Sequence, residues 1–164
     1  MRNPRFIVVW VLLAAAVAGG GWWWLHHSER PPQVNAAEYE TDMTEGLLRA
    51  VLREFEGTGT GLCFLAFGEG PTRPSRPFIA RFDGTTPALQ SCGAAESPPN
   101  LGKYFDKGNG MPGVLIEVVK FKEITPDGFD VVVAFSHLPA GQDRFTYRVS
   151  RIGGEWIVRN RKPA

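Results

Sequence analysis

The chain has 164 residues, of which 43% are hydrophobic, and it carries a formal net charge of +1 at pH 7. This length supports one ordinary globular domain with its own core and excludes two large domains. With 18 basic and 17 acidic residues the chain lacks the basic excess with which proteins neutralise phosphates, so its composition argues against nucleic acid as a partner.

The hydrophobic residues concentrate near the N-terminus, where residues 6–25 form an uncharged stretch without proline. As a helix this stretch would be about 30 Å long, which matches the hydrocarbon core of a bilayer. Three tryptophans stand at its far end, and indole rings prefer the headgroup level of a membrane. We therefore predict a transmembrane anchor in residues 1–27 that contacts the lipid bilayer through residues 6–25. The residues expected at the membrane interface are Trp22, Trp23 and Trp24.

Two arginines, Arg2 and Arg5, precede the apolar stretch, so the positive-inside rule places the N-terminus in the cytoplasm. The chain is then a single-pass protein of a bacterial inner (cytoplasmic) membrane, with its C-terminal domain periplasmic or extracellular. Residues 28–36 are predicted to be a tether and residues 37–164 the exported domain. A cleaved signal peptide is the alternative, because residues 16–18 (AVA) form a small-x-small cleavage site.

The only two cysteines, Cys63 and Cys92, both lie in the predicted exported part. An even number of cysteines in an oxidising compartment favours a disulfide. A bridge between them would close a loop of about 30 residues and stabilise the fold by roughly 3 to 4 kcal/mol. A redox-active pair is the alternative, but the wide spacing lacks the C-x-x-C geometry that tunes thiol reactivity. We therefore predict a structural disulfide.

Residues 35–56 have the periodicity of a long amphipathic helix. Asn35 can accept hydrogen bonds from the first backbone amides, and Gly57 ends the pattern. A helix with one apolar stripe must pack on a partner, and a curved sheet is the partner that the rest of the chain offers. The stripe consists of Met43, Leu47, Leu48, Val51, Leu52 and Phe55.

The remaining chain is dominated by strand patterns. Residues 62–67 are apolar on both faces, as expected of a buried strand, whereas residues 68–109 are rich in proline and glycine. The C-terminal third alternates apolar and polar residues, which predicts an antiparallel meander of about four strands with one dry face. The predicted fold class is α+β: an N-terminal transmembrane helix, then a long amphipathic helix packed on a curved, cone-like sheet. The four runs are residues 114–124, 129–136, 144–151 and 155–160.

Basic residues are concentrated at the C-terminal end, where Glu155 is the only carboxylate side chain after Arg144. A charge run on strands is commonly a solvated face. The alternative is a binding patch for an acidic partner or for anionic lipid. The six basic residues are Arg144, Arg148, Arg151, Arg159, Arg161 and Lys162.

The element order, together with the ending Gly154, Trp156 and Val158, resembles the nuclear-transport-factor-2-like group, also called cystatin-like. The resemblance covers residues 36–162. It implies a bent sheet that wraps a helix into a cone. Some enzymes of the group place an inward-facing Asp or His and a hydrogen-bond-donating Tyr inside that cone.

The exported part is also similar to small uncharacterised bacterial domains with one cysteine in the first strand and another in an S-C element, here Cys63 and residues 91–92. That similarity implies no known activity. On the predicted dry faces only Tyr147 could donate a hydrogen bond to a ligand, and Phe145 and Phe135 would line the same candidate pocket. We therefore expect a pocket around these three side chains if the cone is hollow.

The sequence shows no paired carboxylates, no nucleophile beside a base and no cluster of metal-ligand type, so no catalytic, metal or cofactor-binding residue is expected. The leading hypothesis is a membrane-anchored extracytoplasmic binding or scaffolding domain without catalysis, with a protein partner in the cell envelope. One alternative is a pocket that binds or isomerises a small apolar ligand, with Tyr147 as the donor. A signal-cleaved, secreted domain is another.

Overall fold

The computed structural model describes residues 34–97, 104–137 and 141–164, all within one compact unit of the chain. The predicted transmembrane anchor, its interfacial tryptophans and most of the tether lie outside the described residues. Within the described ranges, no helix has the length and apolarity needed to cross a membrane.

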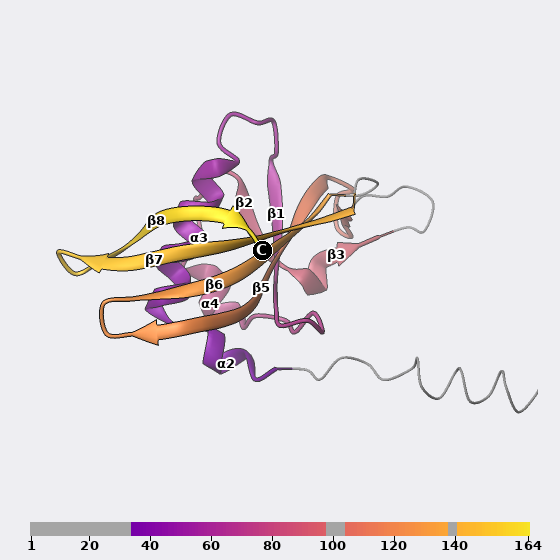
Figure 1. Ribbon diagram of the computed structural model, residues 1–164. Helices are drawn as coiled ribbons and strands as arrows, with labels where there is room; N and C mark the ends of the chain where they lie inside the picture. The colour runs from indigo at the N-terminus through magenta and orange to yellow at the C-terminus, as the bar shows by residue number, and fades with distance from the viewer. Residues whose placement is uncertain (1–33, 98–103, 138–140) are drawn as a thin grey trace, which may run out of the picture. The chain divides into compact units, whose positions relative to one another are not determined.

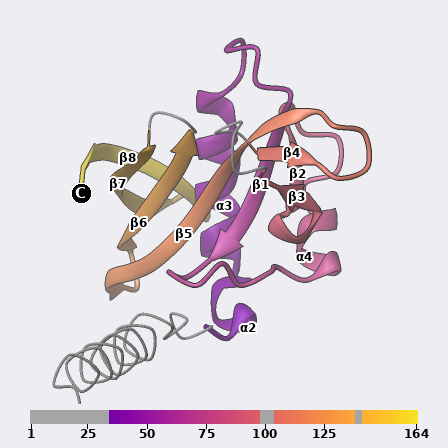
Figure 2. The same ribbon diagram turned by 90° about the vertical axis from the view of Figure 1, so that its right-hand side faces the viewer.

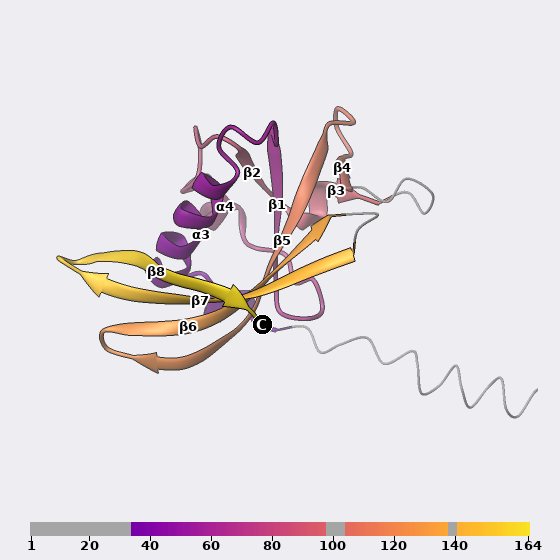
Figure 3. The same ribbon diagram turned by 45° about the horizontal axis from the view of Figure 1, so that its top comes forward.

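Six strands form the main path of a mixed sheet, in the order β2-β1-β5-β6-β7-β8, and two short strands attach beside β5 (Figure 1). Strand β1 pairs in parallel with both β2 and β5, whereas β5 to β8 pair antiparallel in chain order. The β5–β6 and β7–β8 hairpins project in the same direction (Figure 3). The strands are β1 (Leu62–Phe67), β2 (Ala88–Ser91), β3 (Ala95–Glu96), β4 (Tyr104–Asp106), β5 (Pro112–Thr125), β6 (Gly128–His137), β7 (Gly141–Ile152) and β8 (Glu155–Pro163).

The described helices are short, and side-chain caps set where they begin. Asn35 accepts a hydrogen bond from the backbone amide of Ala37, and Thr41 accepts one from the amide of Thr44. Gly46 allows the longest helix to approach the last strand, because a Cβ atom there would lie 2.5 Å from Cβ of Trp156. The helices are α2 (Ala36–Tyr39), α3 (Asp42–Glu54), α4 (Arg76–Ala80) and the 3-10 turn η1 (Cys92–Ala94).

The predicted fold class is wrong. The described residues are 49% strand and 21% helix, and the α-helices have only 4, 13 and 5 residues. The long helix predicted over residues 35–56 is interrupted at Thr41, whose extended backbone (φ −111°, ψ 165°) caps a new helix. Periodicity alone missed this break because a threonine side chain that bonds a nearby backbone amide competes with helix continuation. The parallel pairing of β1 also contradicts the predicted antiparallel sheet.

The main core lies on one face of the sheet, here called the inner face, which α3 covers (Figures 1 and 2). The apolar side of α3, Phe78 of α4 and Phe82 just after it pack there against every second residue of β1, β5, β6 and β7. The opposite, outer face carries two smaller apolar clusters. The first is Leu62, Phe64, Ala66 and Leu115, and the second is Val119, Val132 and Ala134.

Candidate functional site

The predicted pocket residue Tyr147 lies in the packed core, where its side chain is fully buried. Its hydroxyl donates a hydrogen bond to Oε2 of Glu54, with a donor–acceptor distance of 3.2 Å. Its ring packs edge-on against Phe135, with 6.4 Å between the ring centroids. Burial, and then the Glu54 carboxylate, raises the pKa of the Tyr147 phenol well above its usual value. The hydroxyl is therefore engaged within the protein rather than directed at a ligand.

The other two predicted residues, Phe135 and Phe145, line a pocket of 290 Å³ beside the C-terminal end of α3. Arg161 also lines this pocket. Its guanidinium carbon lies 3.6 Å from the ring centroid of Phe145, and its Nη1 atom forms an ion pair with Oε2 of Glu54 at 2.5 Å. Tyr147 takes no part in this lining. The pocket therefore contains an internally satisfied ion pair over aromatic rings, and its volume lies at the lower limit for ligand sites.

The two cysteines of the predicted disulfide, Cys63 and Cys92, are both free thiols in this structure. Consecutive residues of a strand point to opposite faces. Cys63 belongs to the main core on the inner face, whereas Cys92 packs against the outer cluster that contains Phe64. The sheet thus lies between the two cysteine side chains in this structure, and the disulfide stays a prediction. Burial raises the pKa of the Cys63 thiol to about 12.

Sequence reasoning missed a carboxylate on the outer face. Glu117 is only 8% exposed, and the side-chain amide of Gln142 donates a hydrogen bond to its Oε2. Burial raises the pKa of Glu117, although the Gln142 bond and the nearby Arg144 act in the opposite direction. Alternation alone could have placed Glu117 on this face, but its burial depends on a partner 25 residues away in the chain.

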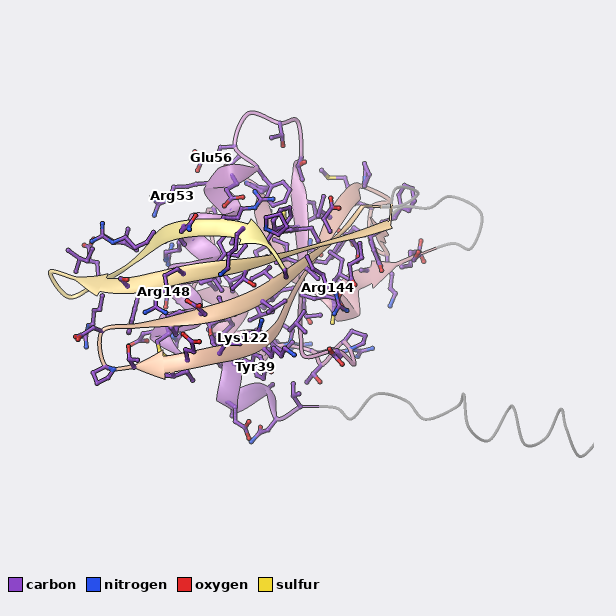
Figure 4. All side chains as sticks on the ribbon, in the orientation of Figure 1. Tyr39, Arg53, Glu56, Lys122, Arg144 and Arg148 are labelled. Carbon is purple, nitrogen blue, oxygen red and sulfur yellow. The ribbon has the colours of Figure 1, made fainter. Side chains whose placement is uncertain are left out.

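Five exposed basic side chains share the outer face of β5, β7 and β8, and we call this surface the basic face. Cross-strand register places them there: Lys120 stands opposite Val132 of the outer cluster, and Lys122 stands opposite Asp130. Figure 4 shows two residues from β5 and β7 on this side of the sheet, Lys122 and Arg148. The basic face consists of Lys120, Lys122, Arg144, Arg148 and Lys162.

The charges on the basic face are unevenly paired. Arg148 bonds Asp130 at 2.9 Å and lies 3.8 Å from Glu123. In contrast, the described carboxylates form no salt bridge with any of the three lysines. The predicted C-terminal basic run is therefore divided. Arg161 and Arg151 lie over aromatic rings, whereas three other residues of the run share the basic face with two lysines of β5.

Within the described ranges, no group of three or more His, Cys, Asp or Glu side chains could hold a metal ion. Comparison of the chain with models of protein families, with curated proteins and with solved structures finds no match. The functional argument therefore starts from the charge and packing of the described surface.

Proposed function

We propose that the chain is a membrane-anchored extracytoplasmic binding domain, without catalysis, and that it docks an acidic protein partner against the basic face. Residues 6–25 supply the anchor in this proposal, and the domain works outside the cytoplasm. The observation that carries the binding role is a set of three unpaired lysines around an apolar floor.

The apolar floor is formed by Val119, Val132 and Ala134, which are at most 4% exposed. Lys120, Lys122 and Lys162 surround it with exposed ammonium groups. Because the apolar floor is almost fully covered, a partner would contact the exposed lysines around it rather than the floor itself. Complementary charge then speeds encounter and selects acidic surfaces over basic ones. A carboxylate-rich partner would supply counter-charges that the described part of this chain does not.

The packing of the inner face supports a partner-binding surface over an internal catalytic pocket. Tyr147 is the donor that the isomerase-type alternative needs, but its hydroxyl is bonded to Glu54 and its ring is fully buried. The adjoining Arg161 is likewise paired with Glu54. General acid or base chemistry there would first require breaking these contacts.

Site-specific photo-crosslinking in native membranes tests the binding surface. A benzophenone amino acid replaces Lys122 on the basic face or, as the matched control, the exposed Arg53 on α3 (Figure 4). We expect a protein adduct from position 122 and none from position 53. The adduct yield should fall when salt rises from about 0.05 to 0.5 M, because ions screen exposed charges.

The same partner, once purified, gives the quantitative test. Charge reversal by K120E and K122E together should weaken its binding by at least about tenfold, whereas R53E should change it less than about twofold. Equal adduct yields from positions 122 and 53, or adducts with lipid alone, would overturn the proposal. Binding of a partner whose surface is not acidic would overturn it as well.

The anchor is tested separately by the intact mass of the protein in membranes. A retained N-terminus and resistance to alkaline extraction are expected. A mature chain that has lost residues 1–18 would contradict the anchor and support the signal-cleaved alternative.

A further inference from the structure

A second surface site lies away from the basic face, where α4 and the preceding loop meet the β2–η1 turn. The pocket there has a volume of 600 Å³, which is within the range of small-molecule sites. Its lining residues include Ile79 of α4 and Ala94 of η1, which are apolar, and the basic residues Arg73 and Arg76. The pocket thus combines an apolar surface with two cations, one from the loop before α4 and one from the first residue of α4.

The guanidinium of Arg73 is held close to the backbone of the opposite wall. A Cβ atom built on Gly93 would lie 2.9 Å from Nε and 3.2 Å from Cζ of Arg73, so a larger residue there would push the Arg73 side chain aside. The Arg73 guanidinium therefore lies beside Gly93, and its N–H groups remain donors for a ligand.

Both arginines lack an anionic partner within the part of the chain that the structure describes. No described carboxylate forms a salt bridge with Arg73 or Arg76, although Asp83 contributes to the same lining. Arg81, in contrast, pairs with Asp42 at 3.4 Å and with Glu45 at 3.2 Å. The two cations of the pocket are thus available for an anion, and Asp83 disfavours negative charge on its side of the ligand.

We propose that this pocket binds a small organic anion, whose oxyanion head is held by Arg73 and Arg76 and whose short apolar body packs on Ile79 and Ala94. Guanidinium groups recognise planar and tetrahedral oxyanions through paired N–H donors. The apolar wall adds affinity in proportion to the area that it removes from water. An inorganic anion without an apolar body should therefore bind more weakly than an alkyl carboxylate or alkyl phosphate.

Calorimetric titration of the full-length chain in a non-ionic detergent tests the site. The probes are butanoate, butyl phosphate, inorganic phosphate and butyltrimethylammonium, so that the head and the apolar body are varied separately. We expect saturable binding of at least one butyl anion, weaker binding of inorganic phosphate and no binding of the cation. The stronger of the two butyl anions identifies the head group as carboxylate or phosphate.

Variants locate the binding. R73A and R76A should each weaken the binding of the butyl anion by at least about tenfold, since each removes a charged hydrogen-bond donor. R159A removes an exposed arginine of β8 that does not line the pocket, and it should leave affinity within about twofold.

G93A keeps every charge but displaces the Arg73 side chain, so it should weaken binding by about fivefold or more. If R73A fails to fold, R73K and G93A carry the test, because both retain a cation at position 73. The proposal is overturned if neither butyl anion binds below about 10 mM. Equal affinity of R73A, R76A and wild type, or equal affinity for the butyl cation, overturns it too.

Discussion

Strand β6 shows how differently the two faces of the sheet are used. Val131 points to the inner face and is fully buried in the main core, whereas its neighbour Val132 points to the outer face and belongs to a three-residue cluster. The inner face is closed by α3 and α4 and pairs its polar atoms internally. The outer face places lysines around a small apolar floor. The inner face therefore packs the main core, while the outer face carries lysines that form no salt bridge with a described carboxylate.

Removing a large inner side chain should have the largest effect. Phe129 is fully buried between Phe121 and Trp156, with centroid distances of 5.5 and 5.4 Å. We expect F129A to lower the free energy of unfolding by about 3 to 5 kcal/mol, because it leaves a cavity that neighbouring elements cannot fill. Urea denaturation measures this change. A loss below about 1 kcal/mol would show that the inner face is loosely packed.

The adjacent residues Val131 and Val132 of β6 allow the same substitution, valine to alanine, to be compared on the two faces. V131A should lower the free energy of unfolding by about 2 to 3 kcal/mol and V132A by about 1 kcal/mol, because fewer atoms surround the outer side chain. Both variants remove the same two methyl groups from the same strand. The same denaturation experiment decides, and equal losses would refute the distinction between the faces.

The rates at which the two cysteine thiols are alkylated give a third comparison of the two faces. In the native protein at about pH 8, alkylation should label Cys92 and leave Cys63 unmodified, while denaturation without reductant should expose both thiols. A thiol with a pKa of about 12 contains roughly one thiolate in ten thousand at that pH, and burial also blocks access. Mass spectrometry counts the labels. If denatured protein took up label only after reduction, the two thiols would be bridged.

Substituting Glu117 should change stability least, and the size of this change depends on pH. Burial raises its folded-state pKa above the unfolded value, so the folded protein binds a proton more readily and loses stability as pH rises between the two values. E117Q removes this penalty. Its thermal midpoint should exceed that of wild type at about pH 7 and match it below the ordinary pKa of Glu, about 4.3. A difference independent of pH would contradict this account.

Local patterns located much of the secondary structure. Alternation along residues 114–160 marks the strands of the meander, because one face of each strand is dry. The apolar period marks α3, whose Leu47 and Val51 are fully buried. The same period did not reveal the break before α3, since a side-chain cap at Thr41 leaves the hydrophobic pattern unchanged.

The sites were less predictable from sequence than the strands. Tyr147, Phe145 and Phe135 do lie together, yet the carboxylate that engages Tyr147 comes from α3, 93 residues earlier. The basic run at the C-terminus was visible, but the two β5 lysines join it only through strand register. The pocket at Arg73 depends on Gly93, which belongs to a different element and carries no side chain that a motif could show.

The sequence by itself determined which segments alternate, which helix face is apolar, and that charge is near balance, because these are properties of neighbouring residues. Only the tertiary structure decided that β1 pairs in parallel with β2 and β5 and that Cys63 and Cys92 belong to clusters on opposite faces. Only the register of β5 to β8 brings Lys120 and Lys122 to the face of Lys162. Such pairings join residues distant in the chain, and their free energy comes from packing that no local pattern records.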